Sequence, residues 1–385
     1  MKYNFDEVID RRGTNSYKWD SDPDPDVLPM WVADMDFRTA PAITEALRRR
    51  VDQGIFGYTL VPYSYYESLG RWFERRHGWH IDKESVIYTS GVVSAISAVI
   101  KALTEQGDKV IVQTPVYNCF FSSIRNNGCE IDASPLIATE NTYEMDFEDL
   151  ERRASDPRVK VFLLCNPHNP VGRVWTRDEL ERAGEICLRH GVTVVSDEIH
   201  CELTMPGYRY TPFASINEEF GKHSVVCVSP SKAFNIAGLQ IANIVCRDGA
   251  VRAKIDRAIN DNEVCDVNPF GVIALQEAYN NGEEWLDCLL QYIAANYEYM
   301  RAFCAEHLSD FPITKLEGTY LVWMDCRKLG LPSEKIEEEL LDKVKLWLNA
   351  GSMYGDAGEG FMRWNIACPR ARLEEGLKRF LKFVR

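Results

Sequence analysis

The sequence has no excess of positive charge and no long apolar stretch. Its 385 residues include 44 Lys and Arg against 58 Asp and Glu, which gives a formal net charge of −14. Nucleic acids and anionic membranes bind basic surfaces, so neither is expected as a partner. No segment approaches the roughly 18 apolar residues of a membrane span, and the first residues lack the apolar core of a signal peptide. We therefore expect a cytoplasmic protein.

Paired cysteine motifs are also absent. The twelve cysteines begin at Cys119 and end at Cys368, and no two of them form a C-x-x-C pair. Disulfide frameworks and structural zinc sites use regularly spaced cysteines. Scattered thiols of this kind are typical of a reducing compartment, and we expect no metal site.

Short apolar runs alternate with amphipathic segments from about residue 86. The sequence predicts strands over residues 86–89, 109–113, 159–165, 193–198, 225–229 and 241–246. Helical patterns lie between these strands, including one over 177–190, and the polar stretch between residues 114 and 158 is also interpreted as helical. This order predicts an α/β fold in which helices cover both faces of a mostly parallel, doubly wound sheet.

The chain is long enough for two domains with a sizeable buried interior. Long helices are expected near residues 269–308, and the strand patterns over 320–325 and 361–366 indicate a smaller α/β domain. The start of the chain is rich in Pro and Asp and is expected to pack on that domain as an extended arm. We predict an arm that forms part of the small domain over residues 1–45, a large domain over 46–283 and a small domain over 284–385.

Lys232 stands directly beyond an apolar run with the pattern of a buried strand, in the segment SPSKAFNIAGLQ. The carboxyl ends of parallel strands face the ligand crevice of an α/β sheet. There, desolvation and nearby positive groups lower the pKa of an ammonium, and the neutral amine can attack a carbonyl to form a Schiff base. The hydroxyls of Ser229 and Ser231 suit a phosphate, although serines also occur in turns for conformational reasons. Pyridoxal phosphate carries both groups.

Two other strand ends carry polar residues that suit a pyridine ring. Asp197 ends the run TVVSD, and a carboxylate against the ring nitrogen keeps that nitrogen protonated, so that the ring can accept electrons. Asn169, in CNPHNPVG, could donate a hydrogen bond to the ring's phenolic oxygen. Taken singly, Asp197 could be a helix cap and Asn169 a turn residue.

Five further residues complete the candidate site. The free amides of Gly91, Val92 and Val93 follow a strand and begin a helix, which predicts a phosphate cradle. Tyr117 could stack on the cofactor ring or bond to its oxygen, although an isolated tyrosine would be a core residue. Arg363 lies on a predicted strand of the small domain, where its guanidinium could bind an amino-acid carboxylate or form a surface ion pair.

These segments together resemble the fold-type I pyridoxal-phosphate enzymes of the class I/II aminotransferase superfamily, over nearly the whole chain. More narrowly, LPMWVADMDF, FGYT, VSDEIH, SPSKAFNIAGLQ and RWNIACPR are similar to the cystathionine β-lyase (C-S lyase) subgroup of MalY and PatB. The resemblance implies that Lys232 binds the cofactor covalently and removes the substrate Cα proton, and that Asp197 pairs with the pyridinium. It further implies that Arg363 binds the substrate carboxylate.

The resemblance also implies a homodimer with shared active sites. Asn169 and Tyr117 would contact the ring, and Tyr58 would reach from the neighbouring subunit to the phosphate. His200 and Gln240 depart from the broader superfamily, in which many members carry a tyrosine and an arginine at these positions. His200 is expected near the ring oxygen. Without the arginine, phosphate binding would shift to the serines, the amides near Gly91 and Tyr58.

The subgroup resemblance implies a lyase that cleaves L-cystathionine, L-cystine or other cysteine S-conjugates to a thiol, pyruvate and ammonia. An amino-acid aminotransferase would use the same residues in the same roles, so the motifs alone leave both reactions open. A cofactor-sensing transcriptional regulator is a third alternative. Such a regulator would be expected to carry a basic helix-turn-helix module, and the sequence shows none.

Overall fold

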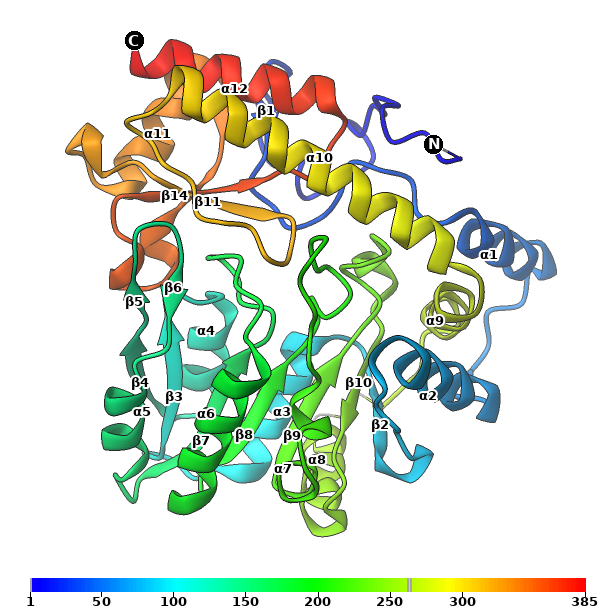
Figure 1. Ribbon diagram of the computed structural model, residues 1–385. Coiled ribbons are helices and arrows are strands. Elements are labelled where there is room, and N and C mark those ends of the chain that lie inside the picture. Colours follow the sequence, from blue (N-terminus) through cyan, green and yellow to red (C-terminus); the bar gives the residue numbers. More distant parts are fainter. Residues whose placement is uncertain (1, 262, 264) are drawn as a thin grey trace.

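A computed structural model describes residues 2–261, 263 and 265–385 and arranges them in two stacked α/β parts (Figure 1). The larger part contains a central sheet, and the smaller part lies across one end of its strands. Among the described residues, no helix is long and apolar enough to cross a membrane.

The central sheet has seven strands in the order β2-β10-β9-β8-β7-β3-β4. Their bounds are β2 (Val86–Thr89), β3 (Lys109–Thr114), β4 (Glu130–Pro135), β7 (Val159–Cys165), β8 (Thr193–Asp197), β9 (Ser224–Val228) and β10 (Ala242–Val245). β10 is antiparallel to both of its neighbours, and the other pairs are parallel. The predicted mostly parallel sheet is therefore confirmed.

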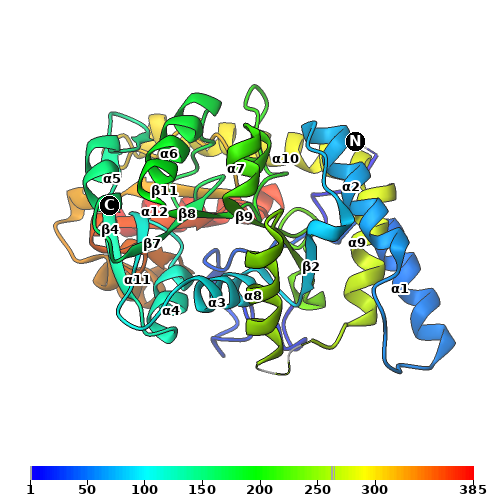
Figure 2. The ribbon, with the colours of Figure 1, turned by 90° about the horizontal axis from the view of Figure 1, so that it is seen from below.

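Helices cover both faces of this sheet, as Figure 2 shows from below. α3 (Val92–Leu103), α4 (Cys119–Asn126) and α8 (Gly249–Asn260) lie on one face, and α5 (Phe147–Ala154), α6 (Arg177–His190) and α7 (Glu218–Lys222) lie on the other. The alternation of side chains along a strand explains the two layers. Val161 and Leu163 of β7 join the core beneath α3, whereas Phe162 and Leu164 join the core beneath α6.

The smaller part is built on an antiparallel sheet of β11 (Leu321–Asp325), β14 (Phe361–Asn365) and β13 (Asn349–Ala350). α10 (Glu283–His307), α11 (Ser333–Val344) and α12 (Arg370–Val384) pack around it (Figure 1). The N-terminal segment joins this part through β1 (Leu28–Pro29), which pairs in parallel with β12 (Leu346–Trp347).

The remaining helices lie beside β2 at the edge of the sheet. They are α1 (Pro41–Gln53), α2 (Tyr63–His77) and α9 (Pro269–Asn281), and their side chains belong to the same continuous apolar core as residues of the arm and of α12. Because one core unites these segments, the domain boundaries at residues 45 and 283 stay a prediction.

The polar stretch between residues 114 and 158 differs from the helical interpretation. It contains α4 and α5, but also β4 and a hairpin of β5 (Ile137–Ala138) and β6 (Tyr143–Glu144). β4 pairs only with β3 and stands at the edge of the sheet. Its sequence, EIDASP, is partly exposed and poor in strand-forming residues. Pairing with a buried neighbour outweighs its weak local preference.

Candidate active site

A cavity of about 550 Å³ lies between the carboxyl ends of the central strands and the small part. Most of the predicted site residues line it: Gly91, Val92, Val93, Tyr117, Asn169, Asp197, His200, Ser231, Lys232 and Arg363. Ser229 and Tyr58 do not. The structure therefore brings together residues that lie as far apart in the sequence as Gly91 and Arg363.

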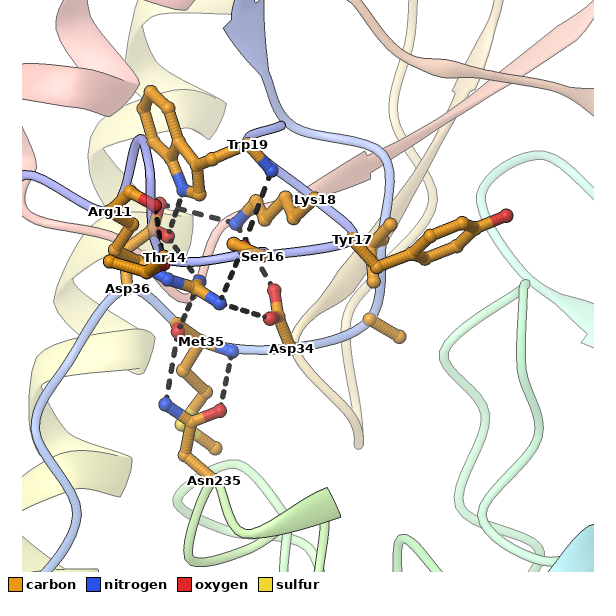
Figure 3. A network of polar contacts seen from close by, with 12 residues as sticks. Arg11, Thr14, Ser16, Tyr17, Lys18, Trp19, Asp34, Met35, Asp36 and Asn235 are labelled. Carbon is orange, nitrogen blue, oxygen red and sulfur yellow. Dashed lines mark hydrogen bonds and ion pairs between the residues drawn. The ribbon is translucent and has the colours of Figure 1, made fainter. Parts of the chain in front are cut away.

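Lys232 follows β9 in a turn whose conformation is fixed by the N-terminal segment. Its Nζ donates a hydrogen bond to the carbonyl of Ala33 at 2.7 Å. Three residues further on, the Asn235 amide accepts from the N–H of Met35 at 2.9 Å and donates to the carbonyl of Met35 at 3.0 Å (Figure 3). Burial, together with the charge of Arg363, lowers the pKa of Lys232 to about 8. A substantial part of this amine is thus uncharged at mildly alkaline pH.

Asp197 ends β8 and is buried at the bottom of the cavity. Burial raises the pKa of Asp197 to about 7, and the neighbouring charge of Glu198 acts in the same direction. The backbone N–H of Ile199, which donates to the carboxylate at 3.1 Å, opposes this rise, as does the charge of Lys232. A buried carboxylate with a raised pKa is stabilised by a positive partner, and a protonated ring nitrogen is such a partner.

Glu198 was not predicted from the sequence, although it follows Asp197 directly. It is fully buried and accepts hydrogen bonds from Ser196 at 2.8 Å, from the N–H of Phe213 at 3.0 Å and from Tyr210. Ser196 lies on β8 itself, whereas Tyr210 and Phe213 belong to the segment between β8 and α7. Glu198 therefore fixes the carboxyl end of β8, on which Asp197 is carried.

Arg363 extends from β14 toward the central strands. Its Nη1 donates to the side-chain oxygen of Asn169 at 3.1 Å, and its Nη2 donates to the carbonyl of Trp31 at 2.8 Å. The side chain is 3% exposed, which excludes the surface ion pair considered from the sequence. Among the described residues, its buried Nε has no hydrogen-bond partner. A carboxylate in the cavity would satisfy this donor and the positive charge.

His200 and Tyr117 present uncharged polar groups to the cavity. Burial, together with the charges of Lys232 and Arg363, lowers the pKa of His200 well below 6.5. Its Nδ1 is buried and lacks a partner within the described parts of the chain. Burial raises the pKa of Tyr117, so its phenol stays protonated. Both side chains can form hydrogen bonds with the oxygen substituent of a bound ring.

The predicted phosphate donors divide into two groups. Gly91 is the N-cap of α3, so the first amides of that helix point into the cavity without intrahelical partners. Ser231 also lines the cavity. Ser229 lies behind it, where its hydroxyl donates to the carbonyl of Ile241, accepts from the N–H of Ser231 at 3.1 Å and lies 2.9 Å from the hydroxyl of Ser231. Ser229 is placed to support the turn.

The segment Trp31–Ala33 forms the opposite wall and was predicted only as part of a family motif. Its carbonyl groups hold the functional side chains. Trp31 accepts from Arg363 and also from Asn349, at 3.1 Å, and Ala33 accepts from Lys232 and also from the Tyr320 hydroxyl, at 2.9 Å. A sequence carries no signal for such a role, because every residue has a carbonyl.

Tyr58 lies far from these residues within the same chain. Its side chain is 100% exposed in the connection between α1 and α2, and its neighbours Ile55, Phe56 and Leu60 are exposed as well. The predicted contact of Tyr58 with a phosphate therefore needs a second copy of the chain.

The fold is that of a large enzyme class, as comparison with known proteins shows. The Aminotransferase class I and II family matches residues 25–380, and the chain belongs to this family. Within it, the chain is 46% identical over 380 residues to the cystathionine beta-lyase PatB of Bacillus subtilis, with 98% of each chain covered.

Two solved structures are similar over their whole length. Cystalysin from Treponema denticola, which contains pyridoxal 5′-phosphate, superposes with a TM-score of 0.96 at 34% identity, covering 100% of this chain and 99% of that one. The pyridoxal-phosphate-bound C-S lyase from Staphylococcus hominis superposes with a TM-score of 0.93 at 32% identity, covering 99% of each.

Proposed function

We propose that this chain is a pyridoxal-phosphate-dependent C-S β-lyase. It releases a thiol, pyruvate and ammonia from L-cystathionine, L-cystine or related cysteine S-conjugates. The observation that carries the proposal is the similarity, over 98% of the chain, to a cystathionine β-lyase. The cavity supplies side chains with the chemistry that such a reaction needs.

The residues of the cavity fit the cofactor. Lys232 would bind it covalently, and Asp197 would pair with its ring nitrogen. Asn169, Tyr117 and His200 would surround the ring oxygen. Ser231 and the amides of Val92 and Val93 would hold the phosphate. When bound, pyridoxal phosphate provides an acceptor for the electron pair that remains after a proton leaves the substrate Cα.

The chain's own residues then bind the substrate and move the proton. Arg363 binds the α-carboxylate, which fixes the amino acid between β14 and the central strands. The uncharged amine of Lys232 accepts the Cα proton as a general base. The carbonyl of Ala33, 2.7 Å from Nζ, accepts one N–H of this amine and so restricts its orientation. The sulfur group leaves Cβ as a thiolate with the electron pair of the broken C–S bond, and water hydrolyses the remaining unsaturated amino acid to pyruvate and ammonia.

The active form is proposed to be a homodimer. Large apolar side chains are exposed at the end of α1 and in its connection to α2: Val51, Ile55, Phe56, Tyr58 and Leu60. Contiguous apolar surface of this kind is typical of an interface. A second copy that covers this segment would bring its Tyr58 to the phosphate. Sedimentation of the wild-type protein and of Tyr58→Phe tests the oligomeric state, and both proteins should be dimers. Equilibrium dialysis tests the contact with the phosphate, and the variant should bind the cofactor more weakly than the wild type.

The reaction is tested by incubating the purified protein with L-cystathionine in the absence of any keto acid. Release of thiol and pyruvate in equal amounts is the expected result. Turnover that depends strictly on a keto-acid acceptor, without thiol, would contradict the proposal and favour an aminotransferase. The Lys232→Ala variant is the matched control for thiol released without the site.

A further inference from the structure

Tyr17 is an exposed residue within a tightly held loop. Its side chain is 73% exposed, whereas the next two residues, Lys18 and Trp19, are 1% and 8% exposed. Figure 3 shows Lys18 and Trp19 directed toward Asp36 while Tyr17 points to the opposite side. The tripeptide thus places one aromatic ring outward from an anchored backbone.

The anchor is a buried charge cluster around Asp36, which we call the Asp36 cluster. The carboxylate of Asp36 accepts from Lys18 Nζ at 3.2 Å, from Trp19 Nε1 at 2.8 Å and from Arg11 Nη1 at 2.9 Å. Arg372 adds a further ion pair at 3.1 Å. Because Lys18 and Trp19 follow Tyr17 directly and both bond to Asp36, the backbone of Tyr17 has little freedom.

Tyr17 lines the same cavity as Lys232 and Arg363. Its ring lies 5.2 Å from that of Trp31, and Trp31 stacks on Trp347 with the centroids 4.3 Å apart. The carbonyl of Trp31 is also the acceptor for Arg363. The aromatic rings therefore form a wall that begins beside the proposed carboxylate site and ends at the exposed ring of Tyr17.

Charged groups are confined to the inner end of the cavity. Of its lining side chains within the described residues, Asp197, Lys232 and Arg363 alone carry charge, and the proposed reaction already uses all three. The outer end carries Tyr17 and Met353, which is 40% exposed. A substrate held by its carboxylate and Cα has only its sulfur substituent left to extend toward this aromatic and thioether surface.

We propose that Tyr17 is a specificity-determining residue whose ring packs against the sulfur substituent of the substrate, and that the Asp36 cluster holds the ring in place. This inference rests on the proposed lyase function and names its substrate class. Cysteine S-conjugates with apolar or aromatic substituents are favoured, because the wall offers a hydrophobic contact. Cystathionine remains a substrate, but its charged distal group gains no ion pair from the side chains that line this wall, so its kcat/KM is expected to be lower.

The first experiment compares kcat/KM for S-benzyl-L-cysteine and S-methyl-L-cysteine in the wild type, Tyr17→Ala and Tyr17→Phe. Loss of the ring should lower kcat/KM about tenfold for the benzyl substrate, and less than about twofold for the methyl substrate, which is too short to reach it. Tyr17→Phe keeps the ring and should stay within about twofold of the wild type for both substrates.

The second experiment measures binding without elimination. In 2-amino-5-phenylpentanoate and 2-aminopentanoate, a methylene replaces the sulfur of these substrates, so nothing can leave. Calorimetric titration of the holoenzyme should show that Tyr17→Ala raises the Kd of the phenyl analogue about tenfold and leaves the Kd of the short analogue unchanged. An equal change for both analogues would overturn the inference, because Tyr17 would then affect the site as a whole.

The two proposals fail in different ways. If the wild type releases thiol but Tyr17→Ala affects both substrates equally, the specificity inference is wrong and the lyase function stands. If the wild type releases no thiol from L-cystathionine or from either of these two substrates, the lyase function is wrong, whereas the calorimetric comparison of the two analogues still decides the role of Tyr17.

Discussion

The two walls of the cavity are built in different ways. The wall at the sheet presents side chains from the ends of three neighbouring strands, namely Asn169 after β7, Asp197 on β8 and Lys232 after β9. The wall at the N-terminal arm presents backbone carbonyls, with Trp31 bonded to Arg363 and Ala33 bonded to Lys232. The sheet wall therefore supplies specific reactive side chains. The arm wall holds Arg363 and Lys232 in position with backbone carbonyls, which every residue has.

The walls also differ in what holds them. The strands of the sheet wall are buried on both faces and hydrogen-bonded to neighbours over their length. Within the described residues, the arm contains one two-residue strand, β1, and the Asp36 cluster is its most buried group of charges. A regular sheet spreads its stability over many bonds, whereas the arm concentrates it in a few buried charges. Single substitutions should therefore separate the two walls.

The largest expected effect belongs to the sheet wall. Lys232→Ala removes both the covalent anchor and the general base, so thiol release should fall by at least about 10⁴-fold. The visible absorption of lysine-bound cofactor should also disappear. The free energy of unfolding should not fall in this variant, because burial of the lysine disfavours its charged form in the folded state. Residual activity within about tenfold of the wild type would show that another group removes the proton.

The second effect concerns the arm wall. Asp36→Asn keeps the shape of the side chain but leaves Lys18, Arg11 and Arg372 around a neutral group. Breaking a buried ion pair in this way should lower the free energy of unfolding by about 3 kcal/mol, measured by urea denaturation. Asp34→Asn is the matched control, because Asp34 also contacts Arg11 but is partly exposed, and it should cost less. Equal losses would contradict a special role for Asp36.

The same difference between the two walls decides which features of the structure can be predicted from the sequence. The bounds of β7 and α6 agree with the residues expected from the sequence, because an apolar run and a capping box of Thr176 and Glu179 define them locally. The edge strand β4 could not be predicted, since its pairing with β3 is a tertiary interaction. The side chains that line the sheet wall were predicted from their types, but the carbonyls of Trp31 and Ala33 were not.

A smaller effect is the pH dependence of the reaction between Lys232 and the cofactor. The pKa of Lys232 lies near 8, below the usual 10.5, so the uncharged amine is present above about pH 8 and is lost as the pH falls. Recombination of the cofactor-free protein with pyridoxal phosphate needs this amine. Its rate should therefore rise up to about pH 8 and then level off, as followed by visible absorption. A rate that continues to rise to about pH 10 would contradict the lowered pKa.

Arg363→Gln sharpens that measurement, because burial and the charge of Arg363 are the two largest causes of the lowered pKa. Removal of the charge should move the midpoint of the pH profile upward. Arg327→Gln changes an arginine outside the cavity and should leave the midpoint in place. If both variants give the wild-type midpoint, the charge of Arg363 has no electrostatic effect on Lys232.

The smallest predicted effect separates two neighbouring serines of the sheet wall. Ser231 lines the cavity, whereas Ser229 bonds to Ser231 and to the carbonyl of Ile241 behind it. Ser231→Ala should weaken cofactor binding by about fivefold, the loss of one hydrogen bond of about 1 kcal/mol, with little change in stability. Ser229→Ala should instead lower the free energy of unfolding by about 1 kcal/mol, because buried groups of the turn lose their partner. Equilibrium dialysis of the cofactor and urea denaturation measure the two quantities. If Ser229→Ala weakens cofactor binding as much as Ser231→Ala does, its hydroxyl contacts the phosphate, and the support role inferred from its position is wrong.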